Sequence, residues 1–98
     1  MSGRKIKLGK NINYMMGLIE DFISGKTPRY IFELDFQTEI MNYYKKMARE
    51  DRELAEYFYD MISAEGVDAG DKLSDAEFKK LIRSQYKKVK NAMDDGLD

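Results

Sequence analysis

The stretch TPRYIFELDFQTEIMNYYKKMA, from Thr27 to Ala48, decides the fold class. Its first half alternates apolar and acidic residues, so residues 31 to 36 also fit a β-strand. Two observations favour a helix instead. Thr27 is a suitable N-cap, and Pro28 then occupies the first helical position, where its missing N–H costs nothing. Because apolar residues continue at helical spacing to Met47, we predict a helix from Thr27 to Ala48.

The predicted helix carries two adjacent apolar stripes, which indicates packing against more than one neighbour. One stripe comprises Phe32, Phe36, Ile40, Tyr43 and Met47, and the other comprises Ile31, Leu34, Met41 and Tyr44.

Three further helices are predicted from the same spacing. The first runs from about Asn11 to Ser24, capped by Asn11 or Asn13 and ended by Gly25. Its apolar face comprises Ile12, Met15, Met16, Ile19, Phe22 and Ile23.

The third predicted helix runs from Arg52 to Glu65 and ends at Gly66, with Val67 to Leu73 as a loop. Its core face comprises Leu54, Phe58, Met61 and Ile62. The last helix begins with a capping box from Ser74 to Glu77, and its core face comprises Phe78, Leu81, Ile82, Val89 and Met93.

Short links between four helices favour an all-α, single-domain antiparallel four-helix bundle over residues 1–98. The basic residues 1–10 are expected to be a flexible N-terminal segment.

Composition argues against several classes of function. The 98 residues contain no cysteine and no histidine, and no nucleotide-binding or hydrolase motif occurs. An EF-hand register ending at Glu77 puts Gly66 and Gly70 at ligand positions and Asp71 at the turn glycine. We therefore expect no enzyme activity, no cofactor and no metal site. No signal peptide or membrane span is apparent, so the expected compartment is the cytoplasm.

The charges are sharply segregated although the net charge is only −1. Residues 50 to 77 contain ten acidic and two basic residues, a local charge of −8. Helical spacing places Glu53, Glu56 and Asp60 on one face, with Tyr57 and Tyr59 at its edges. Acids mixed with tyrosines are typical of an interface for a basic protein partner, although a solvated acidic surface is the simpler alternative.

The next twelve residues, KKLIRSQYKKVK from Lys79, carry six bases and no acid. They fit a nucleic-acid interface in which Tyr86 stacks on a base. The slightly acidic domain favours a solvated helix face instead, so no nucleic-acid partner is expected.

The stretch LIEDFISGKTPRYIFELDF resembles the opening of colicin D-type, self-protective colicin-like immunity proteins. An aromatic, a small residue and Gly25 end one helix, and the next carries Phe32 and Phe36 four residues apart. An acidic third helix and LSDAEFKKLI follow in the same order, so the likeness extends from about Leu18 to Val89. The basic first ten residues and the strongly basic last helix depart from the family pattern.

The resemblance implies an immunity protein that binds a cognate bacteriocin-type nuclease toxin with a basic active-site cleft. In that family the toxin cleaves tRNA, and acidic side chains of the inhibitor replace the RNA backbone. Carried over by position, the candidate residues are Glu53, Glu56, Asp60, Asp68 and Asp71. The alternative is a helical regulatory or interaction protein that uses the same patch, or a nucleic-acid-binding module that uses the basic helix.

Overall fold

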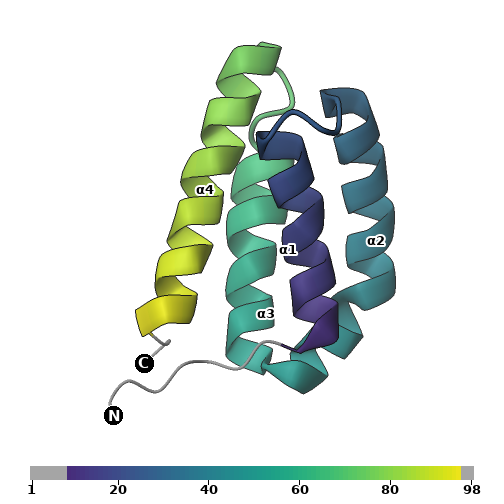
Figure 1. The fold of residues 1–98 in the computed structure, drawn as a ribbon, viewed down its shortest axis with the longest axis vertical. Coiled ribbons are helices and arrows are strands. Elements are labelled where there is room, and N and C mark those ends of the chain that lie inside the picture. Colours follow the sequence, from purple (N-terminus) through teal and green to yellow (C-terminus); the bar gives the residue numbers. More distant parts are fainter. Residues whose placement is uncertain (1–8, 96–98) are drawn as a thin grey trace.

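The computed structural model describes residues 9 to 95, which form a four-helix bundle (Figure 1). In chain order its elements are α1 (Lys10–Ile23), α2 (Arg29–Glu50), α3 (Arg52–Phe58), the π-helix η1 (Tyr59–Asp68) and α4 (Asp75–Asp95). No strand occurs in this part of the chain, so the strand alternative for residues 31 to 36 is wrong. The predicted all-α fold is confirmed.

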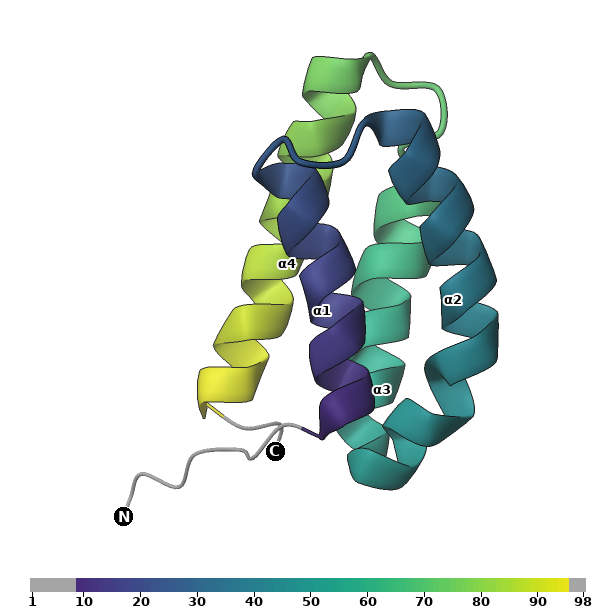
Figure 2. The same cartoon turned by 45° about the vertical axis from the view of Figure 1, so that its right-hand side comes forward.

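α3 passes into η1 without a break, because Phe58 and Tyr59 both keep right-handed helical backbone angles. The two elements form one rod, called here the α3–η1 rod. Consecutive rods of the bundle run in opposite directions (Figures 1 and 2). α1 contacts α2 and α4, and the α3–η1 rod contacts the same two helices. α1 and the α3–η1 rod therefore lie diagonally across the bundle.

Most residues of the predicted core faces of α1, the α3–η1 rod and α4, and of the first stripe of α2, form the core. All five phenylalanines are buried, and their rings make a continuous series of contacts between the helices. Phe22 stacks on Phe32 with ring centroids 4.5 Å apart, and Phe78 lies 5.6 Å from Phe22. Phe36 continues the series to Phe58 at 6.1 Å. Tilted and offset aromatic pairs of this kind add to the stabilisation from apolar burial.

The second stripe of α2 does not pack as predicted. Leu34 is 64% exposed and Met41 is 82% exposed, whereas Ile31 and Tyr44 are half-buried. α2 does contact α1 and the α3–η1 rod, but all of its buried apolar residues belong to the first stripe, and of the second stripe only Tyr44 packs against the core. The outer side of α2 therefore presents apolar side chains to water.

The first two helices begin differently from the prediction. α2 begins at Arg29 with Pro28 as its N-cap, and Thr27 makes no capping bond. The Thr27 N–H donates to the Asp21 carbonyl at 3.1 Å, so Thr27 belongs to the turn that ends α1. That turn contains Gly25 at φ 91°, the left-handed conformation that glycine adopts without strain, as predicted.

α1 begins at Lys10 with Gly9 as its N-cap, so neither Asn11 nor Asn13 caps it. The capping group is instead the Glu50 carboxylate at the end of α2. It accepts bonds from the backbone N–H groups of Asn11 and Ile12 at 2.8 and 2.9 Å, and from Asn11 Nδ2 at 2.6 Å. The predicted flexible segment 1–10 lies outside the described residues apart from Gly9 and Lys10, which belong to the start of α1.

The third helix does not end at Gly66 as predicted, because η1 continues to Asp68. Gly66 is buried, and a Cβ added there would lie 3.0 Å from Ile82 Cδ1 of α4 and 3.2 Å from the Met61 carbonyl. Gly66 therefore allows the rod to approach α4 closely. The predicted loop shortens to residues 69–74, and Met61 is only half-buried.

The predicted start of α4 is confirmed in its main feature. Ser74 Oγ accepts a bond from the Glu77 N–H at 3.2 Å and donates to the Glu77 carboxylate at 3.2 Å. The Glu77 side chain thus holds the capping hydroxyl, whereas a standard capping box would bond it to the Ser74 N–H.

Candidate functional site

The predicted acidic residues lie on the outer side of the α3–η1 rod and on the link that follows it. Because α2 and α4 cover its inner side, the exposed positions of the rod share one outer surface. Glu65 also lies there and was missed from the sequence, because the third helix was expected to end at that residue. The exposed carboxylates are called here the acidic face: Glu53, Glu56, Asp60, Glu65, Asp68 and Asp71.

The π-helical winding of η1 determines which side chains join the acidic face. In η1 and just beyond it, exposed residues come in adjacent pairs, at positions 59–60, 64–65 and 68–69. Buried residues come in adjacent pairs between them, at positions 62–63 and 66–67. This interval is wider than an α-helix would give, as expected for i→i+5 hydrogen bonding. Asp60, Glu65 and Asp68 are exposed as a consequence.

Four of the ten acids between residues 50 and 77 have structural roles and do not belong to the face. Glu50 caps α1, and Asp51 caps α3 by accepting a bond from the Leu54 N–H at 3.1 Å. Asp75 pairs with Arg29 at 3.0 Å, and Glu77 holds the Ser74 cap. Part of the acidic run is therefore explained by ordinary helix capping.

The acidic face itself contributes little to the fold. Glu56 pairs with Arg52 at 3.5 Å, but both side chains are largely exposed, and such pairs add little stability. Among the described residues, the other five carboxylates have no hydrogen-bonding or ion-pair partner: Glu53, Asp60, Glu65, Asp68 and Asp71. Like charges on one helix surface repel one another. The face therefore carries charge that the bundle does not need.

An apolar groove adjoins the acidic face, between α2 and η1. Ile40, Met41, Tyr44 and Tyr59 line a cavity of about 400 Å³. The Tyr44 and Tyr59 rings meet edge to face with centroids 5.6 Å apart. Met41 projects into water beside them, and Tyr59 is 42% exposed. We call this cavity the α2–η1 groove; Tyr59, which neighbours Asp60 in the chain, links it to the acidic face.

The two predicted tyrosines of the site differ in their environment. Tyr59 lines the groove, as its exposed position on the flank suggested. Tyr57 is half-buried and packs against the hydrophobic core. Met41 was assigned to a packing stripe from the sequence, and nothing in its local pattern distinguishes a packed residue from an unpartnered one. Tyr59 and Met41 are therefore the exposed apolar candidates of this site.

Arg29 holds the link that carries Asp71, a role that the sequence did not reveal. Its guanidinium donates to the carbonyls of Leu73, Gly70 and Asp71 at 2.6, 3.2 and 3.1 Å. It also pairs with Glu33 and lies 4.2 Å from the Phe78 ring centroid. Burial opposes the charged form, but bonds to Asp75 and Glu33 outweigh it and raise the pKa of Arg29. Arg29 thereby fixes the link that carries Asp71 to α2.

The basic run of α4 is less suited to binding than its sequence suggested. Lys79 is half-buried as a residue, and its ammonium lies 5.4 Å from the centroid of the Phe22 ring, although this residue was expected on the solvated side. The Tyr86 hydroxyl donates to Glu20 of α1, and burial together with that bond raises the pKa of Tyr86. Tyr86 is therefore tied into the bundle, whereas stacking on a base would need a free ring.

No cluster of three or more acidic side chains is placed to hold a metal ion within residues 9 to 95. In the same part of the chain, no helix is both long and apolar enough to cross a membrane. Comparison of the chain with protein-family models, with curated proteins and with solved structures found no match. The resemblance to the colicin-like immunity family remains a prediction from the sequence pattern.

Proposed function

We propose that this protein is an immunity protein, an inhibitor that neutralises a nuclease toxin by placing its acidic face in a basic, RNA-binding cleft. The observation that carries the proposal is the juxtaposition of unpaired carboxylates and an open apolar groove along one side of the α3–η1 rod. Glu53 and Asp60 represent the charged part, and Met41 and Tyr59 represent the apolar part.

The two parts would have different tasks in such a complex. Lysines and arginines of a nuclease cleft are costly to desolvate unless each gains a charged partner. Carboxylates that are not already bonded within the bundle can supply charge-assisted hydrogen bonds to them. An exposed methionine and tyrosine beside them supply the apolar contact area that slows dissociation. A purely solvated acidic surface would have no need of that neighbouring groove.

The test first assays the proteins encoded beside this chain's gene for binding to this chain and for RNA cleavage, and then uses the one that shows both. The double variant Glu53→Lys, Asp60→Lys should lose inhibition and associate at least about tenfold more slowly, because both side chains point to water and steer the encounter. Glu53 and Asp60 are preferred to Glu56, because a Glu56→Lys substitution would also place a lysine next to Arg52 and break their ion pair.

The matched control is Asp21→Lys, Asp94→Lys, which makes the same charge change at exposed sites on α1 and α4. It should inhibit as wild type does. In the groove, Met41→Lys should weaken binding by roughly 2 kcal/mol, as loss of a hot spot does, mainly through faster dissociation. Leu34→Lys, an exposed apolar position outside the groove, is its control. Full inhibition by the Glu53 and Asp60 double variant would refute the proposal.

The alternative of a regulatory interaction protein uses the same surface and differs in its partner. It would be supported if the acidic-face variants lost a specific complex with a neighbouring-gene product that cleaves no RNA. The nucleic-acid alternative is disfavoured by the tie between Tyr86 and Glu20.

A further inference from the structure

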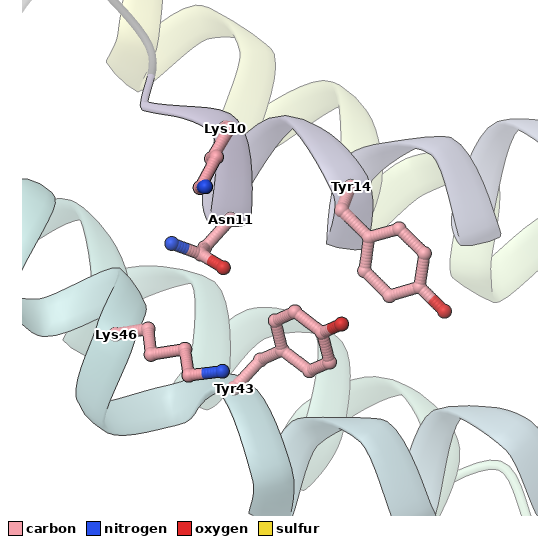
Figure 3. A pocket seen from close by; sticks show the side chains of 5 residues that line it. All are labelled: Lys10, Asn11, Tyr14, Tyr43 and Lys46. Carbon is pink, nitrogen blue, oxygen red and sulfur yellow. The ribbon is translucent and has the colours of Figure 1, made fainter.

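A second cavity lies between the start of α1 and the C-terminal half of α2. Lys10, Asn11, Tyr14, Tyr43 and Lys46 line it, and its volume is about 330 Å³. Figure 3 shows the two lysines on either side of Asn11, and both tyrosine hydroxyls directed away from the lysines. The volume is at the small end of the range for small-molecule sites, roughly 300–1,000 Å³. We call this cavity the α1–α2 cleft; its lining does not overlap that of the α2–η1 groove.

Lys46 is left without an acidic partner by the fold itself. Glu50 follows it by four residues, a spacing at which lysine and glutamate commonly pair on a helix. The Glu50 carboxylate is instead held by the first-turn amides of α1. The Lys46 ammonium lies over the Tyr43 ring, 5.0 Å from its centroid. Within the described part of the chain, neither Lys46 nor Lys10 forms a salt bridge.

The aromatic part of the cleft is also ordered. Tyr14 and Tyr43 stack with ring centroids 4.8 Å apart and an angle of 25° between their planes. The Tyr14 hydroxyl donates to Glu39 at 3.2 Å, and burial together with that bond raises the pKa of Tyr14. The cleft is therefore cationic at the lysine end and rich in hydrogen-bond acceptors at the tyrosine end.

This arrangement selects a ligand with a strongly anionic end and a neutral, hydroxyl-bearing end. Two ammonium groups can balance a phosphate dianion, for which lysine acts as a point charge. The acidic neighbours do not oppose this placement equally. Glu50 keeps its negative charge beside Asn11 and near Lys10, which helps to lower its pKa, but the first-turn N–H groups of α1 offset part of that charge. Glu39 lies at the far end with Tyr14, where it could accept a bond from a ligand hydroxyl or amine.

We propose that the α1–α2 cleft binds a small phosphate monoester, with its phosphate between Lys10 and Lys46 and its organic part along the Tyr43–Tyr14 pair. Nucleoside monophosphates and sugar phosphates share this chemistry. The proposal rests on contacts of α1 and α2 and is independent of the acidic face.

The experiment is an amide NMR titration of the full chain at low salt with AMP, glucose 6-phosphate, adenosine and inorganic phosphate. At least one of the two monoesters should shift the resonances of Lys10, Tyr43 and Lys46 in a saturable way, whereas adenosine should not. Inorganic phosphate should bind more weakly at the same residues. Lys10→Gln and Lys46→Gln should each weaken monoester binding on the order of fivefold, the effect of removing one partly exposed charge contact.

Lys45→Gln is the matched control, since Lys45 is an exposed lysine beside Lys46 that does not line the cleft. It should leave binding unchanged. Equal weakening by Lys45→Gln would mean general electrostatic attraction and would overturn the proposal. So would absence of saturable shifts with both monoesters, equal binding of adenosine, or equal binding of inorganic phosphate.

Discussion

Glu50 joins the start of α1 to the end of α2 through its carboxylate. It accepts three hydrogen bonds, two of them from backbone N–H groups that have no partner within α1. The positive end of the α1 dipole also favours a negative charge there. Burial would raise the pKa of Glu50, but the bonds from Ile12 and Asn11 outweigh it and lower the pKa below its ordinary value of 4.5.

Glu50→Gln should reduce the free energy of unfolding at pH 7 by about 1 kcal/mol, as loss of a helix cap does. Because the pKa of Glu50 is lower in the folded than in the unfolded protein, its stabilisation is complete above pH 4.5 and disappears as the pH falls through the folded-state pKa. Urea denaturation at a series of pH values below 7 should show a constant difference between wild type and variant down to about pH 4.5 and convergence as the pH falls further.

Glu53→Gln is the control for this substitution, since Glu53 is exposed and has no bonding partner among the described residues. A difference between Glu50→Gln and wild type that stays constant from neutral to acid pH would contradict a charge-dependent cap.

At the scale of the helical elements, the caps and apolar stripes predict α1, α2 and α4 to within a few residues. The α3–η1 rod was predicted less well. Spacing cannot show that the winding changes after Phe58, and Gly66 was interpreted as a stop although it serves close packing against Ile82. The error matters for the site, because the change of winding places Glu65 and Asp68 on the acidic face.

The start of α4 provides a test of element stability. Ser74→Ala removes the hydroxyl that accepts the Glu77 N–H and should cost about 1 kcal/mol. Ser84→Ala, at an exposed position inside the same helix, is the control and should be neutral or slightly stabilising, because alanine favours the helix interior. Denaturant melts that show equal stability for both variants would mean that the hydroxyl does not cap α4.

At the scale of the whole molecule, the sequence predicts the bundle and its core better than the site. Burial separates the two kinds of aromatic residue: all five phenylalanines are buried, and all seven tyrosines keep partial exposure. Apolar spacing alone put Tyr43 and Met41 in packing stripes beside true core residues. Whether such a residue packs in the core or lines a cavity depends on how the neighbouring helix lies. Met41, for example, lines the α2–η1 groove together with Tyr59 of η1. Such tertiary placement is not encoded in local pattern.

Arg29 shows the same dependence on tertiary structure, since it connects α2, the link after η1 and α4. Its side chain is 15% exposed, and its donors bond three carbonyls of the link after η1. The planar guanidinium is suited to this task because it presents several donors in a fixed geometry, while its face lies on the Phe78 ring. A lysine at this position would keep the charge and lose that geometry.

Arg29→Met should therefore lower the free energy of unfolding by about 1–2 kcal/mol, because it removes three hydrogen bonds to the link and the ion pairs with Glu33 and Asp75. Arg29→Lys should lower the free energy of unfolding almost as much. Because lysine keeps the positive charge, this loss would show that the geometry of the guanidinium donors matters more than the charge. Arg49→Met, at an exposed position near the other end of α2, should change stability by less than about 0.5 kcal/mol. Urea denaturation gives these values, and amide hydrogen exchange should show faster opening of residues 69 to 74 in both Arg29 variants. Wild-type exchange rates in that segment would mean that Arg29 does not hold the link, even if global stability fell.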